Sequence, residues 1–425
     1  MNNRAELRSL IETANQTVLK TFQDSRPVWF DVRPAIEALP GMTRDTILHA
    51  GPPIEWHRMC EPQRSGTICA ALFEGLADSE SEAVAKIEAG NIRLAPCHEY
   101  GAVGGMAGIT SASSALAMVR DEASGTVGCS QLYQGPRGQL RSRDDYDREA
   151  ARQWRWLAEV LGPVLQTAVR ASGGIDVKHV TAKALQMGDE CHNRNSAASA
   201  LLLMEILPWA LRARIDPASL RDSLAYLTVA EQFSLCVSMA AAKATADAAS
   251  GVSHSTIVTT LSRNGTDFGI RVSGLGDTWF TAPANEVDGL LFSAEWNHDD
   301  TVPDMGDSAI METVGLGGHV QAAAPVLQQF VGGSFQRAVQ LTEEMRQITV
   351  GALQDYRIPN LDFAPAPAAT DIRHVVRTGT TPIIDTAIAH RKGGVIGAGQ
   401  TRAPLDCFKK ALRAFFDTYV QAPES

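Results

Sequence analysis

The stretch Met187-Gly188-Asp189-Glu190-Cys191-His192-Asn193-Arg194-Asn195 separates two apolar segments with helical spacing, Val180 to Gln186 and Ala197 to Leu211. Its carboxylates, thiol, imidazole, amides and guanidinium are costly to place between apolar helices unless each group is paired or used. Gly188 suits the end of the first helix, and Asn195 or Ser196 suits the start of the second. The second helix would direct its positive N-terminal end at the polar stretch. We interpret the stretch as part of an active site.

Length and composition narrow the class of protein. A chain of 425 residues predicts two or three domains. A composition of 44% hydrophobic and 20% charged residues is typical of a folded globular protein. The 38 basic and 48 acidic residues give a net charge of −10 without a long Lys/Arg run, which argues against nucleic acid as a partner.

The apolar stretches and the cysteines indicate where the protein works. Ala200–Leu211 and Cys236–Ala249 are both interrupted by charged residues and fall short of the ~20 apolar residues that cross a bilayer. We therefore expect no membrane association. The seven cysteines are scattered and form no C-x-x-C pair, which favours reduced thiols in a cytoplasmic protein.

Apolar spacing along the chain predicts a multidomain α+β protein, with two mixed α/β domains and a helical middle domain. Strands are expected before residue 142 at Val28–Val32, 115–119 and 127–132. Helical spacing then runs from 144 to 250 with Asp176 and Asp216 as N-caps. Strands return at 255–261, 268–272 and 278–281. The predicted domains are residues 1–142, 143–250 and 251–425.

Three shorter segments give further structural predictions. Gly41 to Pro53 is typical of a capped short helix that Gly51-Pro52 ends. Residues 364–369, rich in Pro and Ala, indicate a connector to strands near 373–377 and 382–386. A helix over 404–419 closes the chain.

Three interpretations of the polar stretch compete. Asp, Glu, His and Cys are all metal ligands, but no H-E-x-x-H spacing or second Cys/His pair accompanies them. A network that caps helix ends is the second interpretation. The third is catalysis or substrate binding, with His192 as the acid/base and Asn193 or Asn195 holding a carbonyl or amide.

Glycine-rich loops supply the other candidates. None of them matches a P-loop or a strand-anchored dinucleotide fingerprint, so we expect no cofactor. Cys97 and His98 are adjacent and would point to opposite sides of an extended chain, which favours a buried Cys97 and a functional His98. Glycine loops beside histidines and arginines suit a small polar or anionic ligand.

Six motifs taken together resemble one family. "MGDECHNRN", "RNGTDFGIRVSG", "GDSAIMETVGLGG" and "PIIDTAIAH" occur in order, with Gly41–Pro53 and Pro96–Gly108 before them. In order and wording they resemble the YlbE-like family over nearly the whole chain. The resemblance implies relatives that serve as subunits of an oxamate carbamoyltransferase in allantoin (purine) breakdown, together with an FdrA-like protein. That system interconverts a carbamoyl-oxamate and phosphate with oxamate and carbamoyl phosphate. His319, after Gly318, departs from the apolar residue expected there.

The resulting hypothesis is a cytoplasmic enzyme or enzyme subunit that transfers a carbamoyl group between a small ureido or oxamate-type compound and phosphate in nitrogen catabolism. Its tetrahedral oxyanion needs N–H or cationic donors, and its departing amide nitrogen needs a proton donor. The predicted catalytic residues are His192, Asp189, Glu190 and His98. The predicted substrate-binding residues are Asn193, Asn195, Arg44, Gly104, Gly105, Asn264, Arg271, Gly317, Gly318, His390 and Arg391.

Two alternatives stay open. One is an amide or ureido hydrolase with a metal at Asp189, Glu190 and His192. The other is a non-catalytic partner subunit of an FdrA-like protein. A homo-oligomer is expected on general grounds.

Overall fold

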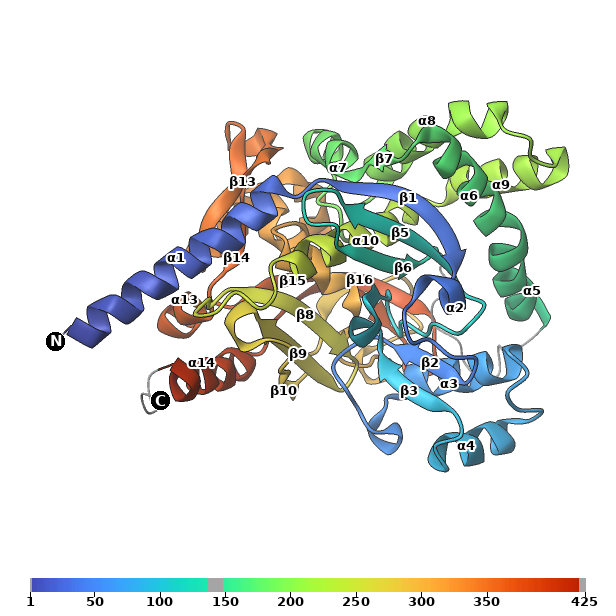
Figure 1. The fold of residues 1–425 in the computed structure, drawn as a ribbon, viewed down its shortest axis with the longest axis horizontal. Coiled ribbons are helices and arrows are strands. Elements are labelled where there is room, and N and C mark those ends of the chain that lie inside the picture. Colours follow the sequence, from blue (N-terminus) through green and yellow to red (C-terminus); the bar gives the residue numbers. More distant parts are fainter. Residues whose placement is uncertain (1, 136–147, 420–425) are drawn as a thin grey trace.

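The structure is a computed structural model that describes residues 2–135 and 148–419 of the chain. Helices accompany several separate sheets, so the predicted multidomain α+β class is confirmed (Figure 1). The described strands form a five-stranded, a four-stranded and a three-stranded sheet and two two-stranded pairs. Helix α1 (Asn2–Asp24) extends outward at the N-terminal end.

The five-stranded sheet has the order β4-β6-β5-β1-β7. Its strands are β1 (Pro27–Pro34), β4 (Ala102–Val103), β5 (Ala115–Asp121), β6 (Val127–Gln131) and β7 (Ile175–Asp176). Strands β1 and β5 pair antiparallel from Pro27 to Pro34, so the strands predicted before residue 142 are confirmed. The edge strand β7 comes from the segment predicted to be helical, and it pairs with β1 through Trp29 and Ile175.

Helices follow the first sheet almost without a break. They are α5 (Arg148–Trp156), a π-helical turn (Leu157–Leu161), α6 (Gly162–Ser172), α7 (Val177–Gln186), α8 (Ser196–Arg212), α9 (Pro217–Val229) and α10 (Phe233–Ala248). Asp176 and Asp216 cap α7 and α9, as predicted, by accepting the backbone N–H groups of His179 and Ser219 at 2.9 Å each.

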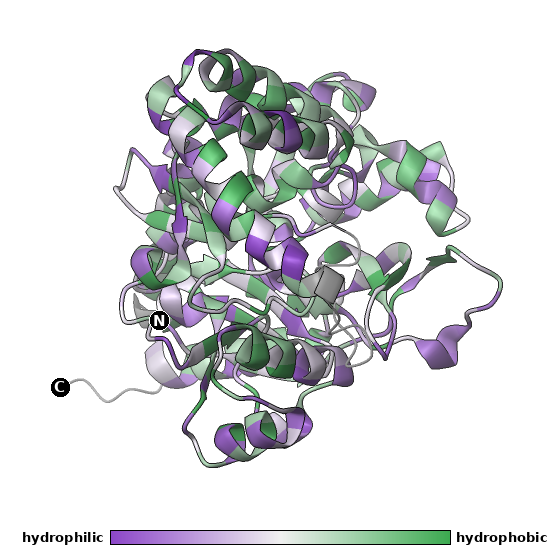
Figure 2. Cartoon of the chain, turned by 90° about the vertical axis from the view of Figure 1, so that its right-hand side faces the viewer, coloured by the Kyte–Doolittle hydropathy of each residue, from purple (hydrophilic) through white to green (hydrophobic). Residues whose placement is uncertain are grey.

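The helical segment shares one apolar core with the first sheet. Trp29 of β1 packs with Leu165 of α6, Leu202 of α8 and Ala240 of α10 in a single buried cluster. Figure 2 views the molecule from the side where these outer helices lie, and it shows hydrophobic and hydrophilic residues alternating along them. The first sheet and the helices therefore share one core. The division into domains at 142 and 250 stays a prediction, and residue 142 lies outside the described residues.

A smaller unit follows β1 in sequence. It contains α2 (Ala35–Ala38), the parallel pair β2 (Thr46–His49) and β3 (Arg93–Pro96), and the helices α3 (Glu61–Phe73) and α4 (Glu80–Glu88). The helix predicted within Gly41 to Pro53 is wrong. All four residues of β2 are buried. A short segment that is covered on both faces can form a strand whose backbone groups are paired with a neighbouring strand, here β3.

The C-terminal part contains three sheets. The four-stranded sheet is formed by β8 (Val258–Asn264), β9 (Asp267–Val272), β10 (Phe280–Pro283) and β12 (Met305–Gly306). The three-stranded sheet is formed by β11 (Asp288–Leu291), β15 (Ile383–Ala389) and β16 (Val395–Arg402). Strands β13 (Thr349–Ile358) and β14 (Ala364–Thr370) pair with each other. The helices are α11 (Ile310–Thr313), α12 (Phe335–Arg346), α13 (Ile372–Thr378) and α14 (Leu405–Tyr419), with 3-10 turns at Gly317–Ala323 and Pro325–Phe330.

Two predictions for this part are wrong. The connector expected at 364–369 is strand β14, whose prolines are tolerated because it pairs with β13 alone. The strand expected near 373–377 lies in helix α13, which Asp371 caps through the N–H of Arg373 at 2.8 Å and Gly379 ends with a φ of 72°. The helix over 404–419 and the strand near 382–386 are confirmed as α14 and β15.

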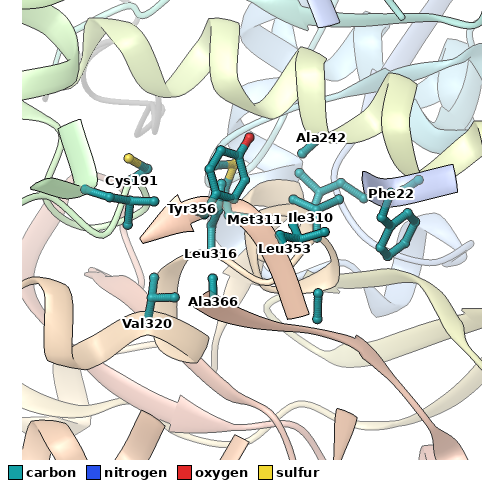
Figure 3. Packing of buried hydrophobic residues seen from close by; sticks show 14 of the residues in the cluster. Phe22, Cys191, Ala242, Ile310, Met311, Leu316, Val320, Leu353, Tyr356 and Ala366 are labelled. Atoms are coloured by element: carbon teal, nitrogen blue, oxygen red, sulfur yellow. The ribbon is translucent and has the colours of Figure 1, made fainter. Parts of the chain in front are cut away.

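A second buried cluster joins the helical segment to the C-terminal part. Figure 3 shows Cys191, from the polar stretch, in the same cluster as Met311 of α11, Tyr356 of β13 and Leu316, which follows α11. No disulfide bond joins any of the seven cysteines, all of which lie within the described residues. In the part of the chain that the structure describes, no single helix is long and apolar enough to span a membrane, and α9 and α10 pass that test only together, bent by 84°.

Candidate functional site

Residues 187–195 form a polar turn between α7 and α8. Gly188 has a φ of 97°, which glycine adopts without strain. The buried Asp189 accepts the N–H of Ala198 at 2.8 Å and so caps α8. Asn195 occupies the N-cap position, but its side chain donates to the carbonyl oxygen of His192 at 2.6 Å instead. The N-terminus of α8 therefore faces the polar stretch, as predicted, with Asp189 as the capping group.

Glu190 folds its carboxylate back onto the turn. It accepts the backbone N–H groups of His192 at 3.2 Å, of Arg194 at 2.9 Å and of Asn193. Cys191 adopts a φ of 66°, an uncommon conformation for a residue with a side chain, and its thiol is buried in the apolar cluster. Together the anchored carboxylate and the buried thiol fix the direction of His192.

His192 pairs with a buried glutamate from a distant part of the chain. Its Nδ1 lies 2.8 Å and 3.0 Å from the two carboxylate oxygens of Glu312, which is 120 residues later in sequence. Glu312 also accepts the N–H of Gly318 at 2.9 Å and of Asp385 at 3.2 Å. Burial alone would raise the pKa of Glu312, but His192, the N–H of Gly318 and the charge of Arg263 lower it, so Glu312 is ionised at neutral pH.

Gly317 is required beside this pair. Its φ of 56° favours glycine, and a Cβ there would collide with the Glu312 carboxylate and lie 3.0 Å from Cβ of His192. Its N–H donates to the carbonyl oxygen of Glu190 at 2.9 Å. The predicted glycine loop is thus a backbone cradle around the His192–Glu312 pair.

Asp385 adds a second buried carboxyl group to the cluster. Gln400 donates to its Oδ1 at 2.8 Å, and Gln321 donates to its Oδ2. Burial and the charge of Glu312 raise the pKa of Asp385 to about 7. Burial and the charge of Asp385 also raise the pKa of Glu190. The site therefore favours proton binding at Asp385 and Glu190 at a higher pH than at exposed carboxyl groups.

A separate centre is built around the buried Asp307. Its carboxylate accepts the N–H of Gly51 at 2.8 Å, the N–H of Gly104 at 2.9 Å and the hydroxyl of Ser262. His98 Nε2 lies 3.4 Å from Asp307 Oδ1 without the alignment of a hydrogen bond. Burial alone would raise the pKa of Asp307, but His98 and the N–H donors lower it. Burial and the charge of Lys243 lower the pKa of His98.

Arg263 connects the two centres. It binds both carboxylate oxygens of Asp304, at 2.7 and 2.9 Å, and donates to the carbonyl oxygen of Gly306 at 2.6 Å. It also donates to the Thr386 hydroxyl at 2.9 Å, while Asn193 donates to the Thr386 carbonyl oxygen at 3.2 Å. Segments from all three predicted domains therefore meet in one buried polar network.

The structure brings several predicted site residues together. Those around Glu312 are His192, Glu190, Asn193, Asn195, Gly317 and Gly318. Those around Asp307 are His98 and Gly104. Asp189 lies next to the first group but serves the start of α8. Their catalytic or binding roles stay a prediction.

The remaining predicted residues belong to neither of these two groups. Arg44 is exposed, and Arg271 pairs with Glu99 and lies 4.4 Å over the Trp279 ring. Asn264 accepts the N–H groups of Thr266 and Asp267 and so shapes the β8–β9 turn. His390 and Arg391 lie in the β15–β16 turn, where Arg391 is 3.8 Å from Asp300. Gly105 lines a small cavity next to Gln232. His319 is buried on the Thr370 hydroxyl at 3.1 Å, and burial lowers its pKa to about 4.

The residues that sequence reasoning missed lie inside the motifs it quoted. Glu312 and Asp307 are in "GDSAIMETVGLGG", Asp385 is in "PIIDTAIAH", and Arg263 begins "RNGTDFGIRVSG". The available signal was a single charged residue within an apolar strand or helix, which is costly to bury unless it is paired.

The ligand-type residues of the polar stretch do not converge. Asp189 accepts an N–H at the start of α8, and Glu190 accepts N–H groups of the turn that follows it. His192 pairs with Glu312. Among the residues that the structure describes, no group of three or more His, Cys, Asp or Glu side chains is arranged to hold a metal ion. The geometry thus gives no support to the metal-dependent alternative.

Comparisons with known proteins agree along almost the whole chain. Residues 92–308 match the family described as "Oxamate carbamoyltransferase subunit AllG". A protein of that name from Escherichia coli (strain K12) is 41% identical over 413 residues, 96% of this chain and 98% of the relative. "Uncharacterized protein YahG" from the same strain is 41% identical over 415 residues, 97% of this chain and 88% of that protein. The crystal structure of a conserved protein of unknown function from Enterococcus faecalis V583 superposes with a TM-score of 0.94 at 40% identity, over 97% of this chain and 99% of that one.

The fold and the network define an α+β protein with a buried histidine–carboxylate centre assembled from distant motifs. The chain belongs to the AllG family, described as a subunit of oxamate carbamoyltransferase. The relationship to a subunit of that enzyme, predicted from the motifs, is confirmed at the level of the family. The name YlbE-like stays a prediction.

Proposed function

We propose that this chain is a subunit of a carbamoyltransferase that moves a carbamoyl group between a small ureido or oxamate-type acid and phosphate in nitrogen catabolism. Membership of the AllG family supports the reaction class. The observation that carries the proposal is the pairing of His192 Nδ1 with the buried Glu312 carboxylate. The lack of disulfide bonds among the seven cysteines, all within the described residues, agrees with a reducing, cytoplasmic setting.

The proposed reaction needs a proton at a defined atom. A phosphate oxygen attacks the carbamoyl carbon, the bond from that carbon to the nitrogen of the acid breaks, and the departing nitrogen takes up a proton. The products are carbamoyl phosphate and the free amide acid. Without general acid catalysis an amide nitrogen is a poor leaving group, and a positioned acid contributes roughly 10²–10⁴-fold.

His192 is suited to give that proton. Glu312 holds Nδ1, which leaves Nε2 as the nitrogen directed at a reacting group. An ionised carboxylate behind the ring also stabilises the charged imidazolium. Burial and neighbouring charges raise the pKa values of Asp385 and Glu190, so these two carboxyl groups provide a proton reservoir beside this pair.

Arg194 supplies a cation on the same stretch. Its side chain is 40% exposed and lies 3.4 Å from the buried Asp189. A guanidinium presents five N–H donors and suits the oxygens of a phosphate. We assign phosphate to Arg194 and the proton transfer to His192, two residues apart on the turn.

The test is an assay of purified proteins for carbamoyl phosphate. This chain, an FdrA-like protein and their mixture are each incubated with a carbamoyl-oxamate and phosphate, and carbamate kinase uses the carbamoyl phosphate formed to convert ADP to ATP. We expect ATP formation that requires this chain. Absence of product from every combination would contradict the proposal.

The same assay separates the subunit's possible roles. Activity of this chain alone would place the whole reaction on it, whereas activity only in the mixture would indicate a site that the partner completes. Full activity of the mixture with His192→Gln would indicate the non-catalytic subunit.

A further inference from the structure

A cleft of about 440 Å³ opens beside the buried network. Its walls come from the loop before β11, from the 3-10 turn and helix α12 that follow, and from β15 and β16. Asn285 ties the loop to β16 by donating to the carbonyl oxygen of Arg402 at 2.7 Å, and Thr401 donates to the carbonyl oxygen of Glu286 at 2.8 Å. The cleft is therefore bounded by elements that are bonded to one another. A volume of this size is within the range of small-molecule sites.

Two arginines line the cleft, Arg337 from α12 and Arg402 from β16, and they share a single carboxylate. Arg337 Nη1 lies 2.9 Å from Glu344, and Arg402 binds the other oxygen of the same carboxylate. Both arginines line the cleft, and their side chains are 43% and 39% exposed. The two guanidinium groups thus share this one carboxylate. Each guanidinium has five N–H donors, so donors remain for a second carboxylate.

The cleft also carries acceptors. Glu286 and Asp288 line the cleft from the loop before β11 and from β11 itself, and both are exposed. A ligand that fits both kinds of group must offer a negative group to the arginines and N–H donors to the carboxylates. A small acid with an amide, ureido or amino nitrogen has this pattern.

Three glutamines connect the cleft to Asp385 by two routes. Gln400 donates directly to Asp385 at 2.8 Å. Gln328 donates to Gln321 at 2.8 Å, and Gln321 in turn donates to Asp385. Gln328 is 1% exposed, and its Oε1 is buried without a hydrogen-bond partner in the described part of the chain. An orphaned buried acceptor at the edge of a polar cleft is a group that a ligand N–H can satisfy.

Gly333 makes room for that acceptor. A Cβ on Gly333 would collide with Gln328 Oε1. The backbone here keeps the amide oxygen beside the cleft, since the Gly333 N–H donates to the Gln328 carbonyl oxygen at 2.8 Å.

We propose that this cleft binds a small carboxylic acid that carries N–H donors, with its carboxylate on Arg337 and Arg402 and its nitrogen toward Gln328 Oε1. The assignment of this ligand as the acid of the carbamoyl transfer rests on the proposed function, whereas its binding in the cleft does not. The cleft thereby places the acid next to Gln400, which donates to Asp385 directly, and next to Gln328, which reaches Asp385 through Gln321.

Calorimetry of the full-length protein tests the proposal with defined probes. Oxamate and N-carbamoylglycine carry both groups, whereas oxamide lacks the carboxylate and acetate lacks the N–H donors. We expect the first two to bind and the last two to bind at least tenfold more weakly. Equal binding of oxamide, or no binding of either acid, would overturn the proposal.

Variants locate the binding in this cleft. Arg402→Gln and Arg337→Gln should each weaken binding roughly tenfold to a hundredfold, because each removes a charge-assisted bond. Gly333→Ala should also weaken it by displacing Gln328. The matched control is Arg346→Gln, on α12 with Arg337 but paired with Glu343 and away from the cleft. If thermal melting shows that Arg402→Gln is unfolded, Arg337→Gln decides alone, because Arg337 is the more exposed arginine. Unchanged affinity in a folded Arg337→Gln would overturn the proposal.

A kinetic comparison separates this inference from the proposed function. Arg337→Gln should raise KM for the acid in the carbamoyl phosphate assay and leave KM for phosphate unchanged. Transfer with an unaltered KM for the acid would overturn the cleft site while the proposed function stands. Binding that responds to the arginines in a protein with no transfer activity would support the cleft site and contradict the proposed function.

Discussion

Asp385→Asn should make the stability of the folded chain less dependent on pH. The carboxyl group is fully buried between two glutamine amides and next to the ionised Glu312. Burial and that neighbouring charge raise its pKa to about 7, from 3.8 for an unperturbed side chain. The folded chain therefore binds a proton at Asp385 that the unfolded chain has already lost at the same pH.

The sign and size of the effect follow from this difference. A carboxyl group whose pKa is raised on folding favours the folded state at low pH, and the advantage falls as pH rises from about 4 to 7. One pKa unit corresponds to about 1.4 kcal/mol. Between pH 5 and pH 8 the native chain should lose about 2 kcal/mol of unfolding free energy through Asp385. This figure allows for Glu190, which interacts with Asp385 and takes up part of the proton binding. The Asp385→Asn variant has an amide that does not titrate at this position, so it should not show this loss.

Urea unfolding at several pH values between 5 and 8 measures the difference. Near pH 5 the variant should match the native chain within about 1 kcal/mol, because a protonated carboxyl and an amide both donate and accept. At pH 8 the variant should have gained about 2 kcal/mol relative to the native chain. The control is Asp31→Asn, since burial of Asp31 is outweighed by Arg170 and Arg33, which lower its pKa. Its cost should be constant over this range. A constant difference for Asp385→Asn would refute the reasoning.

Three further substitutions test the buried network. Gly317→Ala should lower the free energy of unfolding by about 2 kcal/mol or more, because its left-handed φ and the nearby Glu312 carboxylate both oppose a Cβ, and an unchanged urea midpoint would contradict this. Arg263→Lys keeps the charge but loses the bidentate contact with Asp304, so chemical denaturation should show a free energy of unfolding lower by about 3 kcal/mol. An unchanged free energy of unfolding would argue against the link between the two centres. Asp307→Asn leaves one donor of the Gly51 and Gly104 loops without an acceptor, so differential scanning calorimetry should show a stability loss of about 1–3 kcal/mol, and an equally stable protein would exclude this anchoring role.

The sequence predicted the elements whose ends carry their own signals. Asp176 and Asp216 mark helix starts by side-chain capping, and this interaction depends only on residues within one turn. Asp371 and Gly379 stand at the two ends of α13 and carry the same local signal. The prediction of a strand near 373–377 did not use it. Strand β14 was missed because its Pro/Ala composition is typical of a linker. Its pairing with β13 is a tertiary contact that composition does not reveal.

The candidate site was predicted only in part. The turn at 187–195 and the Gly317-Gly318 loop were identified because polar groups and glycines gathered there in sequence. The partner of His192 could not be identified, because Glu312 is 120 residues away and no local rule links the two. Arg44, Arg271, His390 and Arg391 were chosen for their charge, and charge alone does not separate a ligand-binding residue from a surface ion pair.

His192→Gln in the reconstituted carbamoyl phosphate assay tests the central claim most directly. Gln keeps a polar side chain but cannot supply a proton, so the rate should fall roughly 10²–10⁴-fold in a protein that still melts cooperatively. His298→Gln, at an exposed position, should keep the full rate. A folded His192→Gln variant that transfers the carbamoyl group as fast as the native chain would contradict the assignment of this site.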